Sequence, residues 1–364
     1  MYSCESIDNQ IALNRTNPNC FTSHITFCNM MNAANGLGCF PLYKNYNGTP
    51  IDWLEVMEHR EKIKEEFAKG NFPRECKGCF RIQEKEPQKH KQITILQIAA
   101  WNACNSKCVY CESDYFADYQ KYLSDYSLFH KKFVEQYDVV ETVKNMIKTG
   151  VLSKNAKIDI TGGEPTIYPR FNELLACLLE YGCRNINILS NAIVYSPIIE
   201  YGISLNAINL IISIDAGSRD VHKKVKGVSS YDLVWENVSN YHKALKSSQV
   251  HSSKKHWIDL KYIIIENLND SKREIDLWIK KAKDVGVEVL SLNLTDQFNR
   301  NTNYNKSRAI KMVNLSEYAF KKAVKNGFKM YFHPNLQDNY IKLGKEILGN
   351  FNPMETFKED NGLM

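Results

Sequence analysis

The stretch that decides the fold is ITILQIAAWNACNSKCVYC, residues 93–111. Its first seven residues are mostly apolar and β-branched, which predicts a buried strand. Three cysteines follow in the next loop: Cys104, Cys108 and Cys111 are separated by three and then by two residues. Three thiolates at this spacing can hold three irons of a cubane cluster and leave the fourth iron open. The alternative is a zinc loop with a distant fourth ligand, but zinc sites usually take cysteines in pairs separated by two residues.

Strands and helices alternate from residue 93 onward, which indicates βα units around a parallel sheet. Six or seven such units fit a full or partial barrel, and an open doubly wound sheet fits them almost as well. In both architectures the reactive groups lie in loops at the C-terminal ends of the strands. The expected strands are residues 93–99, 157–161, 186–190, 210–214, 259–265, 288–294 and 329–332. The expected helices are residues 52–69, 133–148, 170–181, 231–245, 272–285, 315–326 and 340–348.

The composition is that of a globular protein. The chain has 364 residues, of which 43% are hydrophobic and 24% charged, and its formal net charge is +6. This length suggests about two domains, and the mildly basic balance permits an anionic ligand. The start of the chain lacks the features of a signal peptide, and no long apolar run is present, so we expect a cytoplasmic protein without a membrane span. No concentrated basic and aromatic stripe is present, which argues against a nucleic-acid partner.

Eleven cysteines are the unusual feature of this composition. All of them lie at or before Cys183, so the second half of the chain has no thiolates for a cluster of its own. Clustered cysteines in a reducing compartment indicate metal ligands or redox thiols. Cys177 lies on an apolar helical face and Cys183 just before a strand, so we expect both to pack in the core.

The cysteine triplet resembles the CxxxCxxC signature of the radical S-adenosylmethionine (SAM) enzymes, with Tyr110 as the aromatic residue before the last cysteine. The resemblance covers about residues 93–300, one whole domain. The segment Val225-Lys226-Gly227 has a lysine where an arginine is common. Each motif alone could be a turn or a core element, and only their combination in this order indicates function. Three further motifs similar to those of the family follow predicted strands: Thr161-Gly162-Gly163-Glu164-Pro165, Leu189-Ser190-Asn191-Ala192 and Ile212-Ser213-Ile214-Asp215-Ala216-Gly217.

This resemblance implies an α/β fold, a partial (β/α)6-type TIM barrel with a small cysteine-rich N-terminal module. It implies that Cys104, Cys108 and Cys111 hold a [4Fe–4S] cluster with an open iron, and that SAM binds there. SAM cleavage would give a 5′-deoxyadenosyl radical that abstracts a hydrogen atom from substrate, with an electron donor such as flavodoxin or ferredoxin. Glu164 would pair with the SAM ammonium. The expected SAM-binding residues are Tyr110, Gly162, Gly163, Glu164, Pro165, Ser190, Asn191, Ser213 and Asp215, and no other catalytic residue is assigned.

A second group of cysteines lies in the N-terminal region. Cys76 and Cys79 form a pair separated by two residues, and Cys20 and Cys39 complete a four-thiolate set in which Cys28 is the substitute for Cys20. Such a set binds either an iron–sulfur cluster or zinc. The order of these cysteines around a hairpin and a helix is similar to SPASM or twitch modules, although those modules usually follow the barrel.

Three regions are therefore expected along the chain. Residues 1–92 form the metal-binding module and a linker, residues 93–300 the barrel, and residues 301–364 a strand and helix that complete or cap it. The SPASM-like module favours a peptide or protein as the substrate. The alternatives are a radical SAM enzyme acting on a small polar metabolite, such as a sugar or nucleoside derivative, and a non-catalytic iron–sulfur or zinc scaffold or redox sensor.

Overall fold

The computed structural model contains two compact units, each assembled from several segments. The first comprises residues 1–105, 113–189 and 196–208, and the second residues 106–112, 190–195 and 209–364. The residues described within them are 3–4, 10–14, 24–26, 41–44, 52–72, 82–84, 92–101, 103–111, 124–125, 138–248, 256–294 and 306–332.

The first unit is an α/β sheet whose central strands are parallel. Its strand order is β8-β7-β6-β2-β3-β4, in which β2, β6, β7 and β8 run parallel and β3 is antiparallel to both neighbours. A separate antiparallel pair joins β1 (Ser3–Cys4) to β5 (Ile82–Gln83). The strands of the sheet are β2 (Gln10–Asn14), β3 (His24–Thr26), β4 (Pro41–Lys44), β6 (Ile93–Ala99), β7 (Leu152–Thr161) and β8 (Ile186–Ser190, whose last residue belongs to the second unit).

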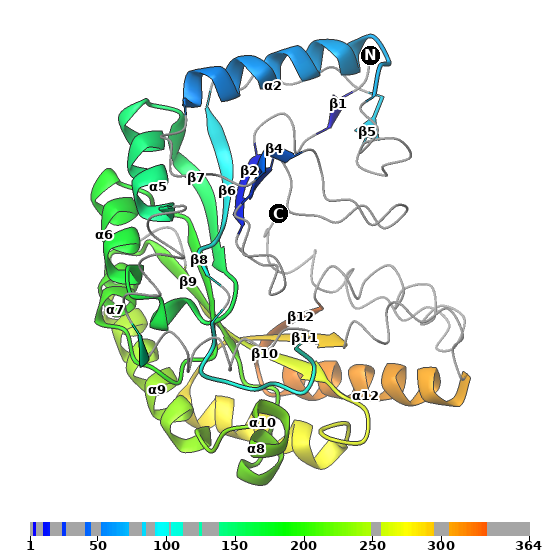
Figure 1. Ribbon diagram of the computed structural model, residues 1–364. Helices are drawn as coiled ribbons and strands as arrows, with labels where there is room; N and C mark the ends of the chain where they lie inside the picture. Colours follow the sequence, from blue (N-terminus) through cyan, green and yellow to red (C-terminus); the bar gives the residue numbers. More distant parts are fainter. Residues whose placement is uncertain are drawn as a thin grey trace. The chain divides into compact units, whose positions relative to one another are not determined.

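Helices α5 (Val139–Lys148), α6 (Phe171–Tyr181) and α7 (Pro197–Ser204) lie along one face of this sheet (Figure 1). The leucines of α6 are buried, because they recur at helical spacing and form its apolar face. Cys183 follows this helix and is fully buried, as expected for a core cysteine. The predicted helix at residues 52–69 is α2 (Trp53–Ala68), and the side chain of Asp52 caps its first turn.

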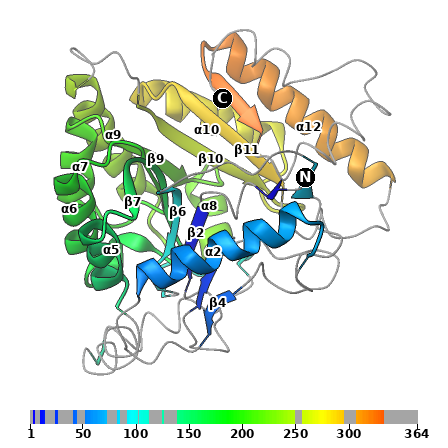
Figure 2. The same cartoon turned by 90° about the horizontal axis from the view of Figure 1, so that it is seen from above.

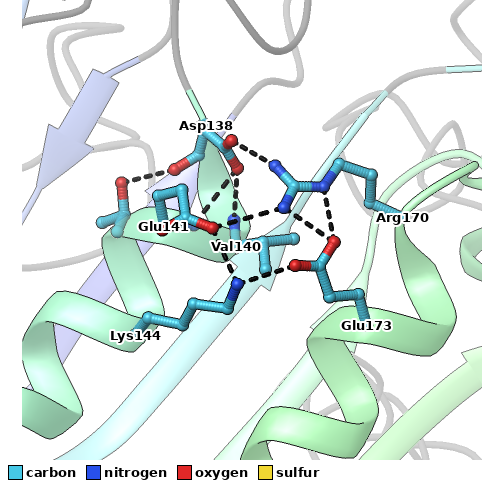
Figure 3. A network of polar contacts seen from close by, with 7 residues as sticks. Asp138, Val140, Glu141, Lys144, Arg170 and Glu173 are labelled. Atoms are coloured by element: carbon cyan, nitrogen blue, oxygen red, sulfur yellow. Dashed lines mark hydrogen bonds and ion pairs between the residues drawn. The ribbon is translucent and has the colours of Figure 1, made fainter.

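The N-termini of α5 and α6 are joined by a network of charged side chains (Figure 3). Arg170 pairs with Asp138, the N-cap of α5, and its Nε donates to Glu173 Oε2 at 2.8 Å. Lys144 Nζ donates to Glu141 Oε1 at 2.8 Å and to Glu173 Oε1 at 2.7 Å. These contacts lower the pKa of both glutamates. Exposed ion pairs stabilise little one by one, but this network fixes the start of α6, just after the Gly-Gly-Glu-Pro loop.

The second unit is also a parallel α/β arrangement. Strands β9 (Ile208–Ser213, whose first residue belongs to the first unit), β10 (Ile258–Ile264), β11 (Val289–Leu294) and β12 (Lys329–Phe332) are neighbours in that order. Figure 2 shows α10 and α12 side by side, next to the last strands. The helices are α8 (Arg219–Lys226), α9 (Tyr231–Ser248), α10 (Lys272–Val285) and α12 (Lys306–Lys325).

The predicted α/β class with a mostly parallel sheet is confirmed. The helix predicted at residues 315–326 begins earlier, at Lys306. The helix predicted at residues 340–348 lies outside the described residues. None of the described helices combines the length and the apolar character needed to cross a lipid bilayer.

Candidate active site

In the first unit, the loop after β6 carries Cys104 and packs against the Gly-Gly-Glu-Pro loop after β7. Strands β6 and β7 are parallel neighbours, so both loops leave the sheet at the same edge. The backbone N–H of Glu164 donates to Ala103 O at 2.8 Å, and Trp101 Nε1 donates to Glu164 O at 3.0 Å. The residue before the first cysteine is therefore fixed by the second motif.

Gly163 makes this close approach possible. Its φ is +54°, and an added Cβ would lie 2.2 Å from the carbonyl oxygen of Ala103. Gly162 has a φ of +83°, and an added Cβ there would lie 2.8 Å from Ala99 Cβ. L-residues with a side chain rarely adopt such positive φ values, and the contacts leave no room for one. The packing of the Cys104 loop thus requires this glycine pair, in addition to any role of the pair in binding a ligand.

The Glu164 side chain is held within its own loop. It is 1% exposed, and its Oε1 accepts hydrogen bonds from Thr166 N at 3.2 Å and from Thr166 Oγ1 at 2.6 Å. This carboxylate caps the short 3-10 turn η3 (Pro165–Ile167), whose first residue, Pro165, is buried. The carboxylate predicted to bind the SAM ammonium is therefore orientated by the protein.

In the second unit, the loop with the other two cysteines is tied to the end of α8. The backbone N–H of Lys107 donates to Lys226 O at 2.8 Å, and that of Val109 donates to Val225 O at 3.0 Å. Cys111 N donates to Cys108 O at 3.0 Å, which closes a turn between the two cysteines. These bonds hold a segment that has no secondary structure of its own.

Tyr110 of this loop contacts the buried side chains of Asp215 and Lys226. The Tyr110 hydroxyl donates to Asp215 Oδ2 at 2.7 Å, and Lys226 Nζ donates to the Tyr110 oxygen at 2.9 Å and also to Asp215 Oδ2. Ile263 N donates to Asp215 Oδ1 at 2.7 Å. Burial raises the pKa of Asp215, but the ammonium groups of Lys226 and Lys261 outweigh it and hold that pKa below its usual value. Both carboxylate oxygens of Asp215 are thus engaged by protein groups.

Of the two residues predicted at the end of β8, Asn191 reaches the cysteine loop. Asn191 Nδ2 donates to Ser106 Oγ at 3.1 Å, and its Oδ1 accepts from Ile193 N at 3.0 Å. Ser190 Oγ accepts from Ala192 N at 2.9 Å, which shapes the turn that follows the strand. Ser190 and Asn191 are both buried. Asn191 therefore positions the loop through Ser106, a contact that spacing alone did not predict.

A row of polar side chains crosses the second unit's strands. The strand registers place Ser213, Lys261, Ser291 and Tyr331 directly opposite one another on β9 to β12. Residues in such register point to the same face of a sheet. The neighbouring residue Tyr262 points the other way, with its ring 4.9 Å from that of Trp278 in α10. The polar row consequently occupies the face that α10 does not cover.

Asp259 extends this polar row and is almost fully buried, at 1% exposure. Its Oδ2 accepts from Ser291 Oγ at 2.7 Å and from the Tyr331 hydroxyl at 2.5 Å. Burial raises the pKa of Asp259 to about 6, against the lowering effect of these hydrogen bonds and of Lys261. The alternation of Asp259 and Lys261 in an otherwise apolar strand is the sequence signal that could have predicted this site.

Asp259 is expected to make the stability of the protein depend on pH. Because its folded pKa lies above the usual aspartate value, folding favours its proton, and stability falls as the pH rises from about 4 to 6. Between the lower and the upper end of this range, the unfolding free energy of Asp259→Asn should therefore rise relative to that of the wild type by up to about 3 kcal/mol. Denaturant unfolding at both ends of the range measures it, with the exposed Asp220→Asn as control. Equal pH dependence of the wild type and Asp259→Asn would contradict this assignment.

The described cysteines provide the donor chemistry of an iron–sulfur cluster. Cys104, Cys108 and Cys111 lie in one loop of the sequence, and Cys104 is buried while Cys111 is exposed. Among the described residues, no group of three or more His, Cys, Asp or Glu side chains is drawn together as a metal site. Joint ligation by these three thiols therefore stays a proposal from their spacing. The other predicted ligands lie outside the described residues: Cys20, Cys28, Cys39, Cys76 and Cys79.

Comparison with known proteins identifies the domain that contains these motifs. Residues 98–253 match the model of the Radical SAM superfamily, so the chain contains a radical SAM domain. A probable GTP 3′,8-cyclase of Saccharolobus solfataricus is 27% identical over 151 residues, which are 41% of this chain and 44% of that relative. The GTP 3′,8-cyclase of Vibrio atlanticus is 31% identical over 98 residues, 27% of this chain and 26% of the relative. The chain thus spans less than half the length of these curated relatives. The domain and these relatives support an enzyme.

A solved structure supports the same fold. The crystal structure of Streptococcus suis SuiB has a TM-score of 0.50 with this chain and 13% sequence identity, over 84% of this chain and 60% of that one. At this identity the likeness concerns the fold alone. The predicted partial TIM barrel of the radical SAM kind is confirmed, whereas a SPASM or twitch module at the N-terminus remains a prediction.

Proposed function

We propose that this protein is a radical SAM enzyme that cleaves SAM reductively and abstracts a hydrogen atom from its substrate. The observation that carries the proposal is the loop with Cys104, Cys108 and Cys111, which lies inside the radical SAM domain and is anchored by the other motifs. When bound, a [4Fe–4S] cluster with an open iron supplies the electron that splits SAM into methionine and a 5′-deoxyadenosyl radical.

The chain's own residues would bind and orient the cluster and SAM. The three thiolates would hold the cluster, and the buried Glu164 would receive the SAM ammonium, an ion pair that exclusion of water strengthens. Ser190, Asn191 and Ser213 are buried polar residues at the ends of strands. They fit the SAM-binding role proposed for them together with Tyr110, Gly162, Gly163 and Pro165. Asp215 fits this role less well, because its oxygens already accept three hydrogen bonds from the protein.

A peptide or protein is our first proposal for the substrate. It is supported by the N-terminal cysteine set, whose order is similar to auxiliary-cluster modules. We propose a second [4Fe–4S] cluster, or zinc, at Cys20, Cys39, Cys76 and Cys79, with Cys28 as the alternative ligand. The division at residues 92 and 300 and a flavodoxin or ferredoxin as electron donor belong to the same proposal.

A small polar metabolite is the second candidate, and the polar row of the second unit favours it. Lys261, Ser291, Tyr331 and the buried Asp259 offer hydrogen-bonding groups on a sheet face that an apolar core would otherwise occupy. The two relatives, one named as a probable GTP 3′,8-cyclase and one as a GTP 3′,8-cyclase, also support a small polar substrate.

The reaction itself can be tested without knowing the substrate. The protein is reconstituted with iron and sulfide without oxygen, reduced with dithionite and supplied with SAM. Methionine and 5′-deoxyadenosine are then expected in equal amounts, and neither should form without the reductant. A protein that carries the cluster and yields neither product would contradict the proposal.

The two substrate classes can be separated with a cell extract. An extract that accelerates SAM cleavage only before protease treatment indicates a peptide or protein. An extract whose effect survives protease treatment and dialyses away indicates a small metabolite.

A further inference from the structure

Lys226 contacts the cysteine loop through both its backbone and its side chain. Its backbone carbonyl accepts the hydrogen bond from Lys107 N, and its ammonium reaches the Tyr110 hydroxyl and Asp215. The side chain is 2% exposed, although it stands in α8, where the nearby Lys223 and Lys224 are exposed. A lysine is buried in this way only where fixed partners receive its charge.

Asp215, the partner of this lysine, is itself rigidly held. It follows β9 with a φ of +55°, a conformation uncommon for residues other than glycine. Its backbone carbonyl accepts from Asn269 Nδ2 at 2.8 Å, and its Oδ1 accepts from Ile263 N at 2.7 Å. Asp215 therefore links the end of β10 to Lys226 and Tyr110, and through them to the cysteine loop.

The close packing of α8 against the loop also indicates that the end of this helix holds the loop in place. Gly227 ends the helix with a φ of +70°, and an added Cβ would lie 2.6 Å from the carbonyl oxygen of Lys107. The helix end and the loop are thus in backbone contact at Lys107, between Cys104 and Cys108. Lys226 and Gly227 thus contact the loop from the end of α8, and Tyr110 is the loop residue whose side chain receives Lys226.

We propose that Lys226 and Asp215 are positioning residues for the metal cluster, which keep the loop of Cys108 and Cys111 in its ligating conformation. Asp215 acts through Tyr110 and Lys226 and does not bind SAM. The role of the loop in holding a cluster rests on the proposed function, but the order of the loop can be measured without any metal. Lys226 stands in Val225-Lys226-Gly227, where an arginine is common in the family. The proposal therefore assigns a function to this lysine.

The test compares Lys226→Met with Lys226→Arg and with Lys223→Met, an exposed lysine of the same helix. Methionine keeps the length of the side chain and removes its charge. Because this leaves Asp215 as a buried, unpaired carboxylate, the double variant Asp215→Asn/Lys226→Met is included, which removes both charges. Circular dichroism establishes that each variant is folded.

The first readout is hydrogen–deuterium exchange of residues 104–111 in the metal-free protein. In Lys226→Met and in the double variant, exchange at the amides of Lys107 and Val109 is expected to rise about tenfold or more. Lys223→Met should match the wild type, and Lys226→Arg should restore most of the protection. Unchanged exchange in both folded variants that lack the lysine would overturn the proposal, whatever their activity.

The second readout is the retention of iron when the reconstituted protein meets a chelator. Lys226→Met is expected to lose its iron at least about tenfold faster than the wild type, since residues that orient metal ligands change affinity by this order. Iron loss at the wild-type rate would also overturn the proposal. If the wild type itself bound no cluster, the proposed function would fail, and the exchange experiment would still decide whether Lys226 orders the loop.

Discussion

The combined replacement of Cys104, Cys108 and Cys111 by alanine is expected to abolish reductive cleavage of SAM. Loss of even an orienting contact to a metal ligand commonly costs 10- to 100-fold in affinity or activity, so removing the three thiolates should lower the rate by more than about 100-fold. The three residues share one loop that neighbouring motifs hold in place. The readouts are 5′-deoxyadenosine formation, and iron, sulfide and zinc per chain after anaerobic reconstitution.

The metal content of this triple variant also tests the N-terminal cysteines. A wild type with about eight irons and a variant with about four would indicate two [4Fe–4S] clusters, and the auxiliary-cluster proposal would stand. A wild type with about four irons, a variant with none and about one zinc in each would indicate a structural zinc site. That result would leave the radical SAM assignment intact and remove the module-based argument for a peptide substrate.

Cys177→Ala is the matched control for the triple variant. This cysteine lies in α6, and burial raises the pKa of its thiol, so it is expected to stay a protonated, unligated side chain. Its replacement should leave both the iron content and the SAM cleavage at wild-type values. Cleavage that persisted in the triple variant would contradict the mechanism directly.

Local patterns were sufficient to predict the elements that carry the radical SAM motifs. The predicted strand at residues 186–190 is β8 with the same bounds, and the predicted strand at residues 93–99 is β6. Both are short runs of apolar, β-rich residues, which is the pattern of a buried parallel strand. The cysteine and Gly-Gly loops follow such strands, so their place at one edge of the sheet followed from topology.

Elements that depend on distant partners could not be predicted in this way. Strand β2 (Gln10–Asn14) is short, and it is a strand because it pairs in parallel with β6, more than 80 residues further along the chain. Helix α8 has the sequence RDVHKKVK, in which most residues are charged, and only His222, Val225 and Lys226 are buried. Such a helix carries too narrow an apolar face for a periodicity signal.

The roles of single residues were hardest to predict where the same residue type can either bind a ligand or make a structural contact. The resemblance suggested that Asp215 contacts SAM, because the carboxylate follows a strand in a family motif. In the structure that carboxylate accepts hydrogen bonds from Lys226, Tyr110 and Ile263 N, which its place after a strand did not predict. A lysine in a polar helix predicts a solvent-exposed side chain, and only the tertiary fold brings Lys226 beneath the cysteine loop.

The replacement of Gly163 by alanine is expected to be the most damaging single change in the glycine loop. A methyl group there would lie 2.2 Å from the carbonyl oxygen of Ala103, which is backbone and cannot swing aside. The left-handed φ of +54° adds a cost of about 1–2 kcal/mol for any residue with a Cβ. Together the two effects should lower the unfolding free energy by about 2–4 kcal/mol, measured by denaturant unfolding of the metal-free protein.

Gly150→Ala separates these two effects. Gly150 also has a positive φ, +71°, but an added Cβ would meet nothing within 4 Å, so this variant carries the backbone cost alone. The difference between the two variants isolates the clash with Ala103, the residue directly before Cys104. Because relief of that clash must displace Ala103, Gly163→Ala should also lose iron faster to a chelator, whereas Gly150→Ala should retain it. Equal stability and equal iron retention in the two variants would show that the Gly163 contact does not position the first cysteine.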